Sequence, residues 1–239
     1  MIKVYPDQEA ISRAAAQLVV EQAAQAVKAR SRFTLVLSGG RTPRRLYEIL
    51  AQPPFRTQIA WEKVHIFWGD ERCVPDDDPR SNARLARQAW LDHVPIPPKQ
   101  IHAIEGNLAP EAAAKDYEAL LRTFFAGRQP RFDLVLLGLG EDGHTASLFP
   151  HHEVLKEQVR WVCEVYLSPT EPPRVTLTQV ILNQAAVLAF LVAGAAKARV
   201  FQEVLQGQPD PERLPAQLLQ PEAGRRLWLV DQDASARLT

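Results

Sequence analysis

Short apolar runs alternate with helix-forming stretches along almost the whole chain, and this alternation restricts the possible folds more than any other feature. Apolar runs typical of buried strands occupy residues 33–37, 64–68, 132–137, 161–165, 187–192 and 227–230. Helical patterns occupy residues 7–30, 44–50, 81–91, 110–125 and 195–205. Strands and helices that alternate in this way form a mostly parallel sheet. The sequence therefore predicts an α/β fold with a doubly wound, mostly parallel sheet and helices on both faces.

The chain shows no internal repeat, low-complexity segment or linker that would divide it. Its proline-containing stretches at residues 76–79 and 169–173 are predicted to be surface loops. With 46% hydrophobic and 23% charged residues, the composition is that of a globular protein rather than a disordered one. We therefore expect residues 1–239 to form one domain.

The overall charge argues against two classes of partner. Lys+Arg and Asp+Glu number 28 each, whereas general nucleic-acid and membrane-surface binders usually carry a basic excess. We therefore expect neither nucleic acid nor a membrane as a partner.

The cysteines and the apolar segments indicate in which cellular compartment the protein is expected. Cys73 and Cys163 are the only cysteines and are spaced for neither a disulfide framework nor a metal knuckle. The first ten residues carry Asp and Glu and lack the apolar core of a signal peptide. The longest apolar run, residues 185–193, is about half as long as a membrane-spanning helix. These features predict a cytoplasmic protein.

Glycine is scarce, so the places where it clusters need a reason. Five of the 11 glycines fall in two short loops, at residues 39–40 and 138–143, each directly after a predicted strand. Ligands of open α/β sheets bind beyond the carboxyl ends of the strands. The two glycine loops are therefore candidate parts of a binding site.

The first glycine loop, LSGGRTP at residues 37–43, has the features of an anion site. Gly39 and Gly40 let backbone N–H groups approach an anion at the start of a helix, and Ser38, Arg41 and Thr42 add side-chain donors. The structural alternative is a plain tight turn. The spacing and the lysine of a Walker A loop are absent, which argues against a nucleotide triphosphatase.

A third strand end carries charged residues in the sequence GDER, residues 69–72. Asp70 is suited to orienting a base or a water, and Arg72 to holding a phosphate or carboxylate. The structural alternative is a salt bridge within a loop.

The second glycine loop contains a misleading motif. Residues 138–143 match G-x-G-x-x-G and follow a strand, but Pro150 leaves no room for the long helix of a dinucleotide site. The loop instead presents His144 next to Asp142. An ordinary imidazole is the usual general base near neutral pH, although a lone histidine is more often structural.

Other readings of these residues are weaker. His144, His151 and His152 match no zinc pattern, so we expect no metal site. No serine lies in a G-x-S-x-G elbow, which argues against a serine hydrolase. Lys197 opens a predicted helix and is either an exposed surface lysine or part of the site.

Taken in order, these motifs resemble the 6-phosphogluconolactonases over nearly the whole chain. The resemblance rests on LSGGRTP at 37–43, WGDERCVP at 68–75, LGLGEDGHTASLFP at 137–150, PRVTLT at 173–178 and GAAK at 194–197. One departure is Arg41, where a serine is common, and it affects only the details of anion contacts. The resemblance implies the fold shared with glucosamine-6-phosphate deaminases and ribose-5-phosphate isomerases.

The resemblance also implies a reaction, which is hydrolysis of 6-phospho-D-glucono-1,5-lactone in the pentose phosphate pathway without metal or organic cofactor. His144 is implied as the general base on a water, and either Asp70 or Asp142 as the group that orients the imidazole or the water. The residues implied in substrate binding are Ser38, Gly39, Gly40, Arg41, Thr42, Arg72, Gly143, Arg174 and Lys197. How the cations divide the contacts to the phosphate is left open, and a monomer or small homo-oligomer is expected.

Two alternatives come from other classes. Glucosamine-6-phosphate deaminases carry a glutamate five residues after the corresponding histidine, where it serves ring opening; here that position is Phe149, which favours the lactonase. A non-catalytic sugar-phosphate sensor is the second alternative. Such sensors usually carry a DNA-binding module, for which we expect no room in these 239 residues.

Overall fold

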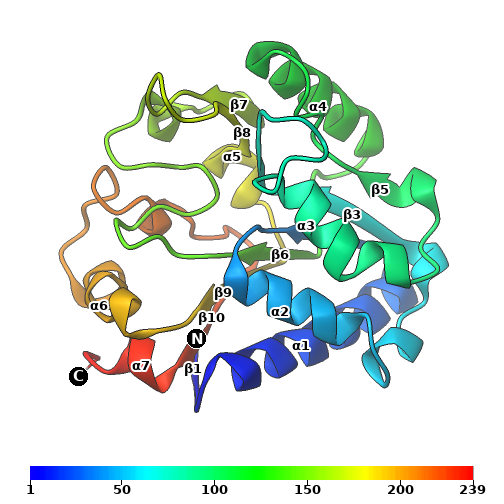
Figure 1. The fold of residues 1–239 in the computed structure, drawn as a ribbon, viewed down its shortest axis with the longest axis horizontal. Helices are drawn as coiled ribbons and strands as arrows, with labels where there is room; N and C mark the ends of the chain where they lie inside the picture. Colours follow the sequence, from blue (N-terminus) through cyan, green and yellow to red (C-terminus); the bar gives the residue numbers. More distant parts are fainter. Residues whose placement is uncertain (239) are drawn as a thin grey trace.

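Parallel strands form the main sheet of the computed structural model, which describes residues 1–238 (Figure 1). Within these residues the sheet has seven strands, in the order β1-β10-β9-β6-β2-β3-β5. Their bounds are β1 (Ile2–Tyr5), β2 (Phe33–Leu37), β3 (Val64–Trp68), β5 (Ile101–His102), β6 (Leu134–Leu137), β9 (Val187–Val192) and β10 (Arg225–Asp231). Every neighbouring pair is parallel, which confirms the predicted sheet.

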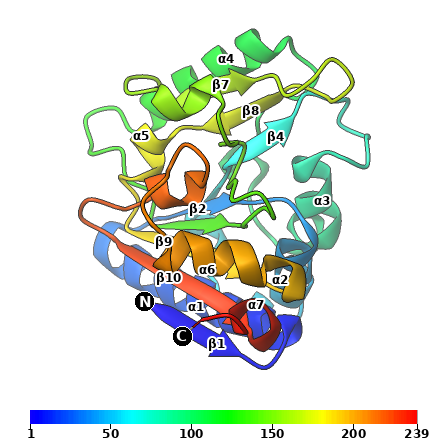
Figure 2. The same cartoon turned by 90° about the vertical axis from the view of Figure 1, so that its left-hand side faces the viewer.

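Helices cover both faces of this sheet, as predicted. They are α1 (Gln8–Arg30), α2 (Arg41–Leu50), α3 (Asn82–Ala89), α4 (Pro110–Phe124), α5 (Gln179–Leu182), α6 (Ala198–Gln206) and α7 (Gln232–Ser235). Figure 2 shows α1 behind β10 and α6 in front of it, so the two helices lie on opposite faces. The strands between them are almost wholly apolar, and every residue of β2, β6 and β9 is buried.

The path of the chain through the sheet creates a crevice. From β2 the chain moves outward through β3 to β5, and it then returns to β6 on the other side of β2 and continues to β9 and β10. The strand order therefore reverses between β2 and β6. At such a switch point the loops at the carboxyl ends separate and leave room for a ligand.

The predicted boundaries change at several places. The helix predicted at 195–205 is a 3-10 turn over Ala195–Lys197 followed by α6, and β10 is longer than the predicted 227–230. Helix α2 begins at Arg41 rather than at residue 44, because Gly40, with φ of 107°, turns the chain directly into the helix and Pro43 is tolerated in its first turn. Strand β6 begins at Leu134 rather than at residue 132. The edge strands β1 and β5 were not predicted, since β1 is mostly exposed and β5 has only two residues.

A second, antiparallel sheet departs most from the prediction. It has the order β4-β8-β7, formed by β4 (Asp70–Arg72), β8 (Arg174–Leu177) and β7 (Val162–Val165). The predicted strand at 161–165 thus lies outside the parallel sheet, and the charged residues 70–72 are a strand rather than a loop. In Figure 2 this small sheet lies above the main sheet, with α4 beyond it.

No helix within residues 1–238 combines the length and the apolar character that crossing a membrane requires.

Tyr47 connects helix α2 to the first glycine loop. Its buried hydroxyl donates to the carbonyl oxygen of Ser38 at 2.7 Å and accepts from the Ser38 N–H at 3.1 Å. The ring stacks on Trp90 with centroids 5.6 Å apart. One hydroxyl therefore satisfies both backbone groups of the residue that directly follows β2.

We predict that Tyr47→Phe lowers the free energy of unfolding by about 1–3 kcal/mol, because two partly buried backbone groups of Ser38 lose the hydroxyl that pairs with them. Urea denaturation measures the change. Tyr5→Phe is the matched control, since the Tyr5 hydroxyl makes no hydrogen bond with residues 1–238. Equal stabilities for the two variants would contradict this role for Tyr47.

Candidate active site

Four loops at the carboxyl ends of adjacent strands meet at one edge of the main sheet. They follow β9, β6, β2 and β3, which are neighbours in that order. The parallel arrangement places the glycine loops and the start of β4 together, although they are up to about a hundred residues apart in sequence. The convergence expected from the strand ends is therefore present.

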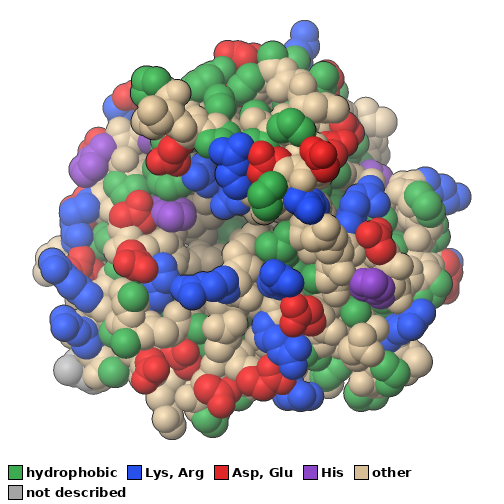
Figure 3. Space-filling model, in the orientation of Figure 1, with side chains coloured by type: hydrophobic (Ala, Val, Ile, Leu, Met, Phe, Trp, Pro, Cys, Tyr) green, Lys and Arg blue, Asp and Glu red, His purple; other side chains and the backbone are tan. Residues whose placement is uncertain are grey.

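These loops surround an open cleft of about 290 Å³. Figure 3 shows the hollow near the centre of one face, with Lys and Arg side chains on both sides of it. Ten of the twelve predicted site residues line the cleft: Ser38, Gly39, Gly40, Arg41, Thr42, Asp70, Arg72, His144, Arg174 and Lys197. Asp142 lies behind His144, and Gly143 uses its N–H within the turn, donating to the Gly140 carbonyl at 3.2 Å.

His144 is held by Asp142. The imidazole Nδ1 lies 2.6 Å from Asp142 Oδ1, and the same oxygen accepts from the His144 backbone N–H at 3.1 Å. Because an ionised carboxylate only accepts hydrogen bonds, Nδ1 carries the proton and Nε2 is left as an acceptor. The arrangement is that of a general base with its orienting carboxylate.

The glycine at position 140 makes this contact possible. A Cβ at Gly140 would lie 2.1 Å from His144 Nδ1 and 2.5 Å from Asp142 Oδ1. The turn is closed by the Gly140 N–H, which donates to the His144 carbonyl at 2.8 Å. Residues 138–152 contain no helix, which agrees with the decision against a dinucleotide site.

The pKa of Asp142 reflects two opposing effects. Partial burial raises it, but the hydrogen bonds and charge of His144 outweigh burial and lower the pKa to about 2. The Asp142 carboxylate is therefore ionised throughout the range in which proteins normally work.

Asp70 has different partners. It is buried at 5% exposure, its Oδ2 accepts from the Ser147 hydroxyl at 2.7 Å, and its Oδ1 lies 3.4 Å from the Asn82 amide nitrogen. Of the two carboxylates that sequence left open, it is therefore Asp142 that contacts the imidazole. Asp70 instead fixes the loop that carries His144 to the start of β4.

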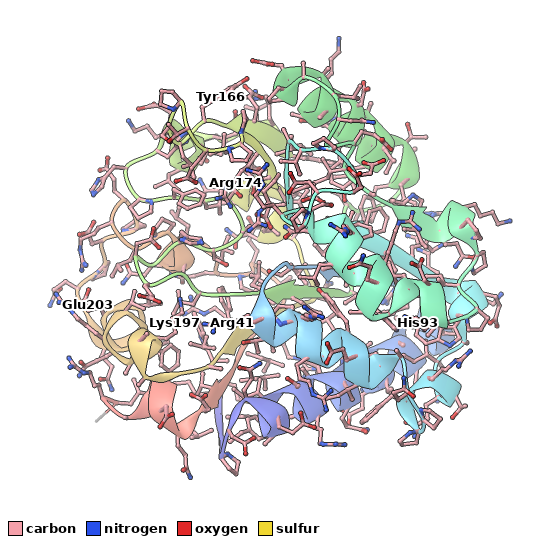
Figure 4. All side chains as sticks on the ribbon, viewed as in Figure 1. Arg41, His93, Tyr166, Arg174, Lys197 and Glu203 are labelled. Carbon is pink, nitrogen blue, oxygen red and sulfur yellow. The ribbon has the colours of Figure 1, made fainter. Side chains whose placement is uncertain are left out.

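The cations of the cleft come from different walls. Figure 4 shows Arg41 and Lys197 close together at one border of the cleft and Arg174 at the other. Arg174 lies opposite Arg72 across the antiparallel β4–β8 pair. Like charges placed opposite each other are unfavourable unless an anion compensates them. This wall is therefore suited to an anionic ligand.

The start of helix α2 adds to the positive side of the cleft. Its N-cap, Gly40, makes no side-chain hydrogen bond, so the first N–H groups of the helix are uncapped. A helix N-terminus with free N–H groups favours an anion. Within residues 1–238, the ion pair of Lys197 is a distant one, with 3.8 Å between its Nζ and Glu141 Oε1.

Sequence reasoning did not identify Asn82, which also lines the cleft. Its amide donates to the Asp70 carbonyl at 2.9 Å, and a Cβ at Gly39 would lie 1.9 Å from its Oδ1. The absence of a side chain at Gly39 thus permits the close approach of Asn82. The only signal in the sequence was the Ser81-Asn82 pair at a helix start.

Among residues 1–238, no group of three or more His, Cys, Asp or Glu side chains is placed to hold a metal ion.

Comparisons with known proteins identify the family. A family model described as "Glucosamine-6-phosphate isomerases/6-phosphogluconolactonase" matches residues 6–228. The chain belongs to this family. A protein from Synechocystis sp. named 6-phosphogluconolactonase is 46% identical over 224 residues, which cover 92% of this chain and 90% of the relative.

Solved structures have the same fold. The 6-phosphogluconolactonase from Trypanosoma cruzi superimposes with a TM-score of 0.88 at 29% identity, covering 100% of this chain and 96% of that one. A monomeric glucosamine-6-phosphate deaminase gives a TM-score of 0.83 at 21% identity, with 98% of both chains covered. The second likeness concerns the fold alone, and it confirms the predicted relationship to the deaminase fold.

We predict that the Asp142 carboxyl carbon titrates with a midpoint of about 2 in the folded protein, against the ordinary value of 3.8. In His144→Ala the midpoint should rise, because the side-chain hydrogen bond and the charge of the imidazole are lost, while the effect of burial and the backbone hydrogen bonds to the carboxylate remain. Carbon-13 NMR from pH 6 to the acid limit of folding measures both titrations.

The sign of the linked stability follows from the lowered pKa. The ionised pair stabilises the fold above pH 3.8, and this contribution disappears as the pH falls towards 2. The stability difference between wild type and Asp142→Asn should therefore shrink over this interval. A difference that grows on acidification would contradict the assignment.

Proposed function

We propose that this protein hydrolyses 6-phospho-D-glucono-1,5-lactone to 6-phospho-D-gluconate, the lactonase step of the pentose phosphate pathway. The observation that carries the proposal is an imidazole oriented by a carboxylate inside a cleft with cations on both walls. The names of the relatives support this substrate. A lactone is an activated ester, so base catalysis and binding of the phosphate account for the reaction without a cofactor.

In the proposed mechanism, His144 Nε2 takes a proton from a water whose oxygen attacks C1 of the lactone. The Asp142 carboxylate stabilises the resulting imidazolium, as its contact with Nδ1 supports. When the tetrahedral intermediate collapses, the bond from C1 to the ring oxygen breaks and that oxygen takes the proton from the imidazolium. Neutral His144 is thereby restored.

The phosphate is proposed to bind among Arg72, Arg174, Lys197 and the N-terminus of α2. Arg174 pairs with Glu171 at 3.3 Å, whereas the Arg72 guanidinium opposite it has no ion pair with residues 1–238. Arg72 and the uncapped helix support this assignment, because both favour a negative charge nearby. The phosphate lies far from the reacting C1 carbon, so its contacts serve to position the carbonyl beside His144. The loop that leads into α2 contributes further contacts to the phosphate through Gly39, Gly40 and Thr42.

The assignment of lactonase rather than deaminase rests on Phe149. The Phe149 ring lies against the imidazole of His144, with centroids 4.4 Å apart, and its other neighbour is the Arg174 guanidinium at 5.2 Å. An apolar ring at this position supplies no acid for opening a sugar ring, and hydrolysis of a lactone requires none.

The proposal is tested by measuring hydrolysis of the phosphorylated lactone above its spontaneous rate, with the unphosphorylated lactone as a control for the phosphate site. Ammonia release from glucosamine 6-phosphate is measured in parallel. Ammonia release without lactone hydrolysis would favour the deaminase, and binding without either reaction would favour a sensor.

We predict that His144→Ala lowers kcat by roughly 10²–10⁴-fold, because it removes the general base, while 6-phosphogluconate still binds. Steady-state kinetics and calorimetry measure the two effects. His151→Ala is the control, since His151 is exposed and does not line the cleft. Near wild-type turnover in His144→Ala would exclude His144 as the base.

We predict that Lys197→Ala raises KM by about 10- to 100-fold with a much smaller change in kcat, because a charged hydrogen bond to the phosphate is lost. Lys156→Ala is the control, since Lys156 is exposed and pairs with Glu153 outside the cleft. A loss confined to kcat would make Lys197 part of the chemistry instead.

A further inference from the structure

The loop of residues 75–81, which follows β4, supports one cation of the cleft from behind. Arg72 Nη1 donates to the backbone carbonyl of Arg80 at 2.5 Å. Among the hydrogen bonds of the described residues, this is the one that anchors the Arg72 guanidinium, and its buried Nε has no partner. The position of the Arg80 carbonyl therefore decides where the Arg72 guanidinium lies.

Asp78 holds that carbonyl in place. Its Oδ1 accepts from the Arg80 backbone N–H at 2.8 Å and from Arg80 Nε at 2.9 Å, and its Oδ2 accepts from Arg80 Nη2 at 2.7 Å. Three hydrogen bonds thus join one carboxylate to one residue. Asp78 is the less exposed partner, with 16% of its side chain accessible against 56% for Arg80.

The loop itself is closed through the backbone of Asp78. The Asp78 N–H donates to the Pro75 carbonyl at 2.9 Å, and the Asp78 carbonyl accepts from the Ser81 N–H at 3.0 Å. Ser81 then caps helix α3 and its hydroxyl donates to the buried Glu71 carboxylate at 3.1 Å. Both ends of the loop are therefore fixed to the strand that carries Arg72.

We propose that Asp78 is a positioning residue for substrate binding, which acts through Arg80 to pre-organise the Arg72 guanidinium at the cleft. The inference rests on the proposed function, in which Arg72 contacts the anionic group of the substrate. A guanidinium held in place before binding loses less freedom when the substrate arrives. Asp78 touches no cleft surface itself, so it affects binding rather than the proton transfer at His144.

The charge state of Asp78 is constant in the working range. Hydrogen bonds from Arg80 lower the pKa of its carboxyl to about 2. The effect of Asp78 on substrate binding should therefore show no acid limb of its own above about pH 4.

The test compares Asp78→Ala with Asp77→Ala, which removes the same charge from the adjacent position. The Asp77 side chain has no hydrogen bond or ion pair with residues 1–238. Its backbone carbonyl, which the substitution keeps, accepts a hydrogen bond from Arg84 Nη1. We expect Asp78→Ala to raise KM for the phosphorylated lactone about two- to tenfold with kcat nearly unchanged, and Asp77→Ala to leave both constants at the wild-type value. Asp78→Asn should lie between them, since its amide oxygen still accepts from Arg80.

A double-mutant cycle with Arg72→Ala identifies the route of the effect. We expect Asp78→Ala to add nothing to KM when Arg72 is already absent. Equal factors with and without Arg72, equal effects of the two aspartate variants, or a loss confined to kcat would each overturn the inference. An inactive wild type, or an Arg72→Ala variant with normal KM, would instead refute the proposed function or its assignment of Arg72.

Discussion

The common direction of the strands in the main sheet is the constraint on which the site depends. Parallel pairing places the carboxyl ends of β9, β6, β2 and β3 at one edge, and the reversal of strand order between β2 and β6 opens a crevice there. Residues that are distant in sequence, from Ser38 to Lys197, therefore meet at this edge. They lie in the turns and loops that directly follow buried strands.

Within this fold, close contacts between neighbouring residues shape the site. Gly140 lets Asp142 and His144 meet above the backbone, and Gly39 does the same for Asn82. The Tyr47 hydroxyl holds the Ser38 backbone directly after β2. The Asp70–Ser147 hydrogen bond connects the loop of His144 to the small sheet. The orientation of His144 is thus determined by the hydrogen bonds and close contacts around it, which is how a pre-organised site is maintained.

The sequence predicted the parts of this structure that follow from local pattern. The parallel sheet, the helices and the glycine loops are visible because buried apolar strands and the turns after them are continuous in sequence. The small sheet is not visible, since β4 and β8 are short and carry Asp, Glu and Arg that resemble a charged loop. The choice between Asp70 and Asp142, and the approach of Asn82 to Gly39, depend on contacts between distant segments that no local pattern encodes.

The two walls of the cleft belong to different sheets. The base and the start of α2 are carried by the parallel sheet, whereas Arg72 and Arg174 are carried by the antiparallel one. The chain passes from one sheet to the other at Gly69. The Gly69 N–H donates a hydrogen bond to the Leu37 carbonyl of β2, and the Gly69 carbonyl accepts one from the Leu177 N–H of β8. The distance between the start of α2 and these two arginines therefore depends on how the two sheets pack against each other. Substitutions in the core between them would change the length of ligand that fits while every residue at the surface of the cleft stayed the same.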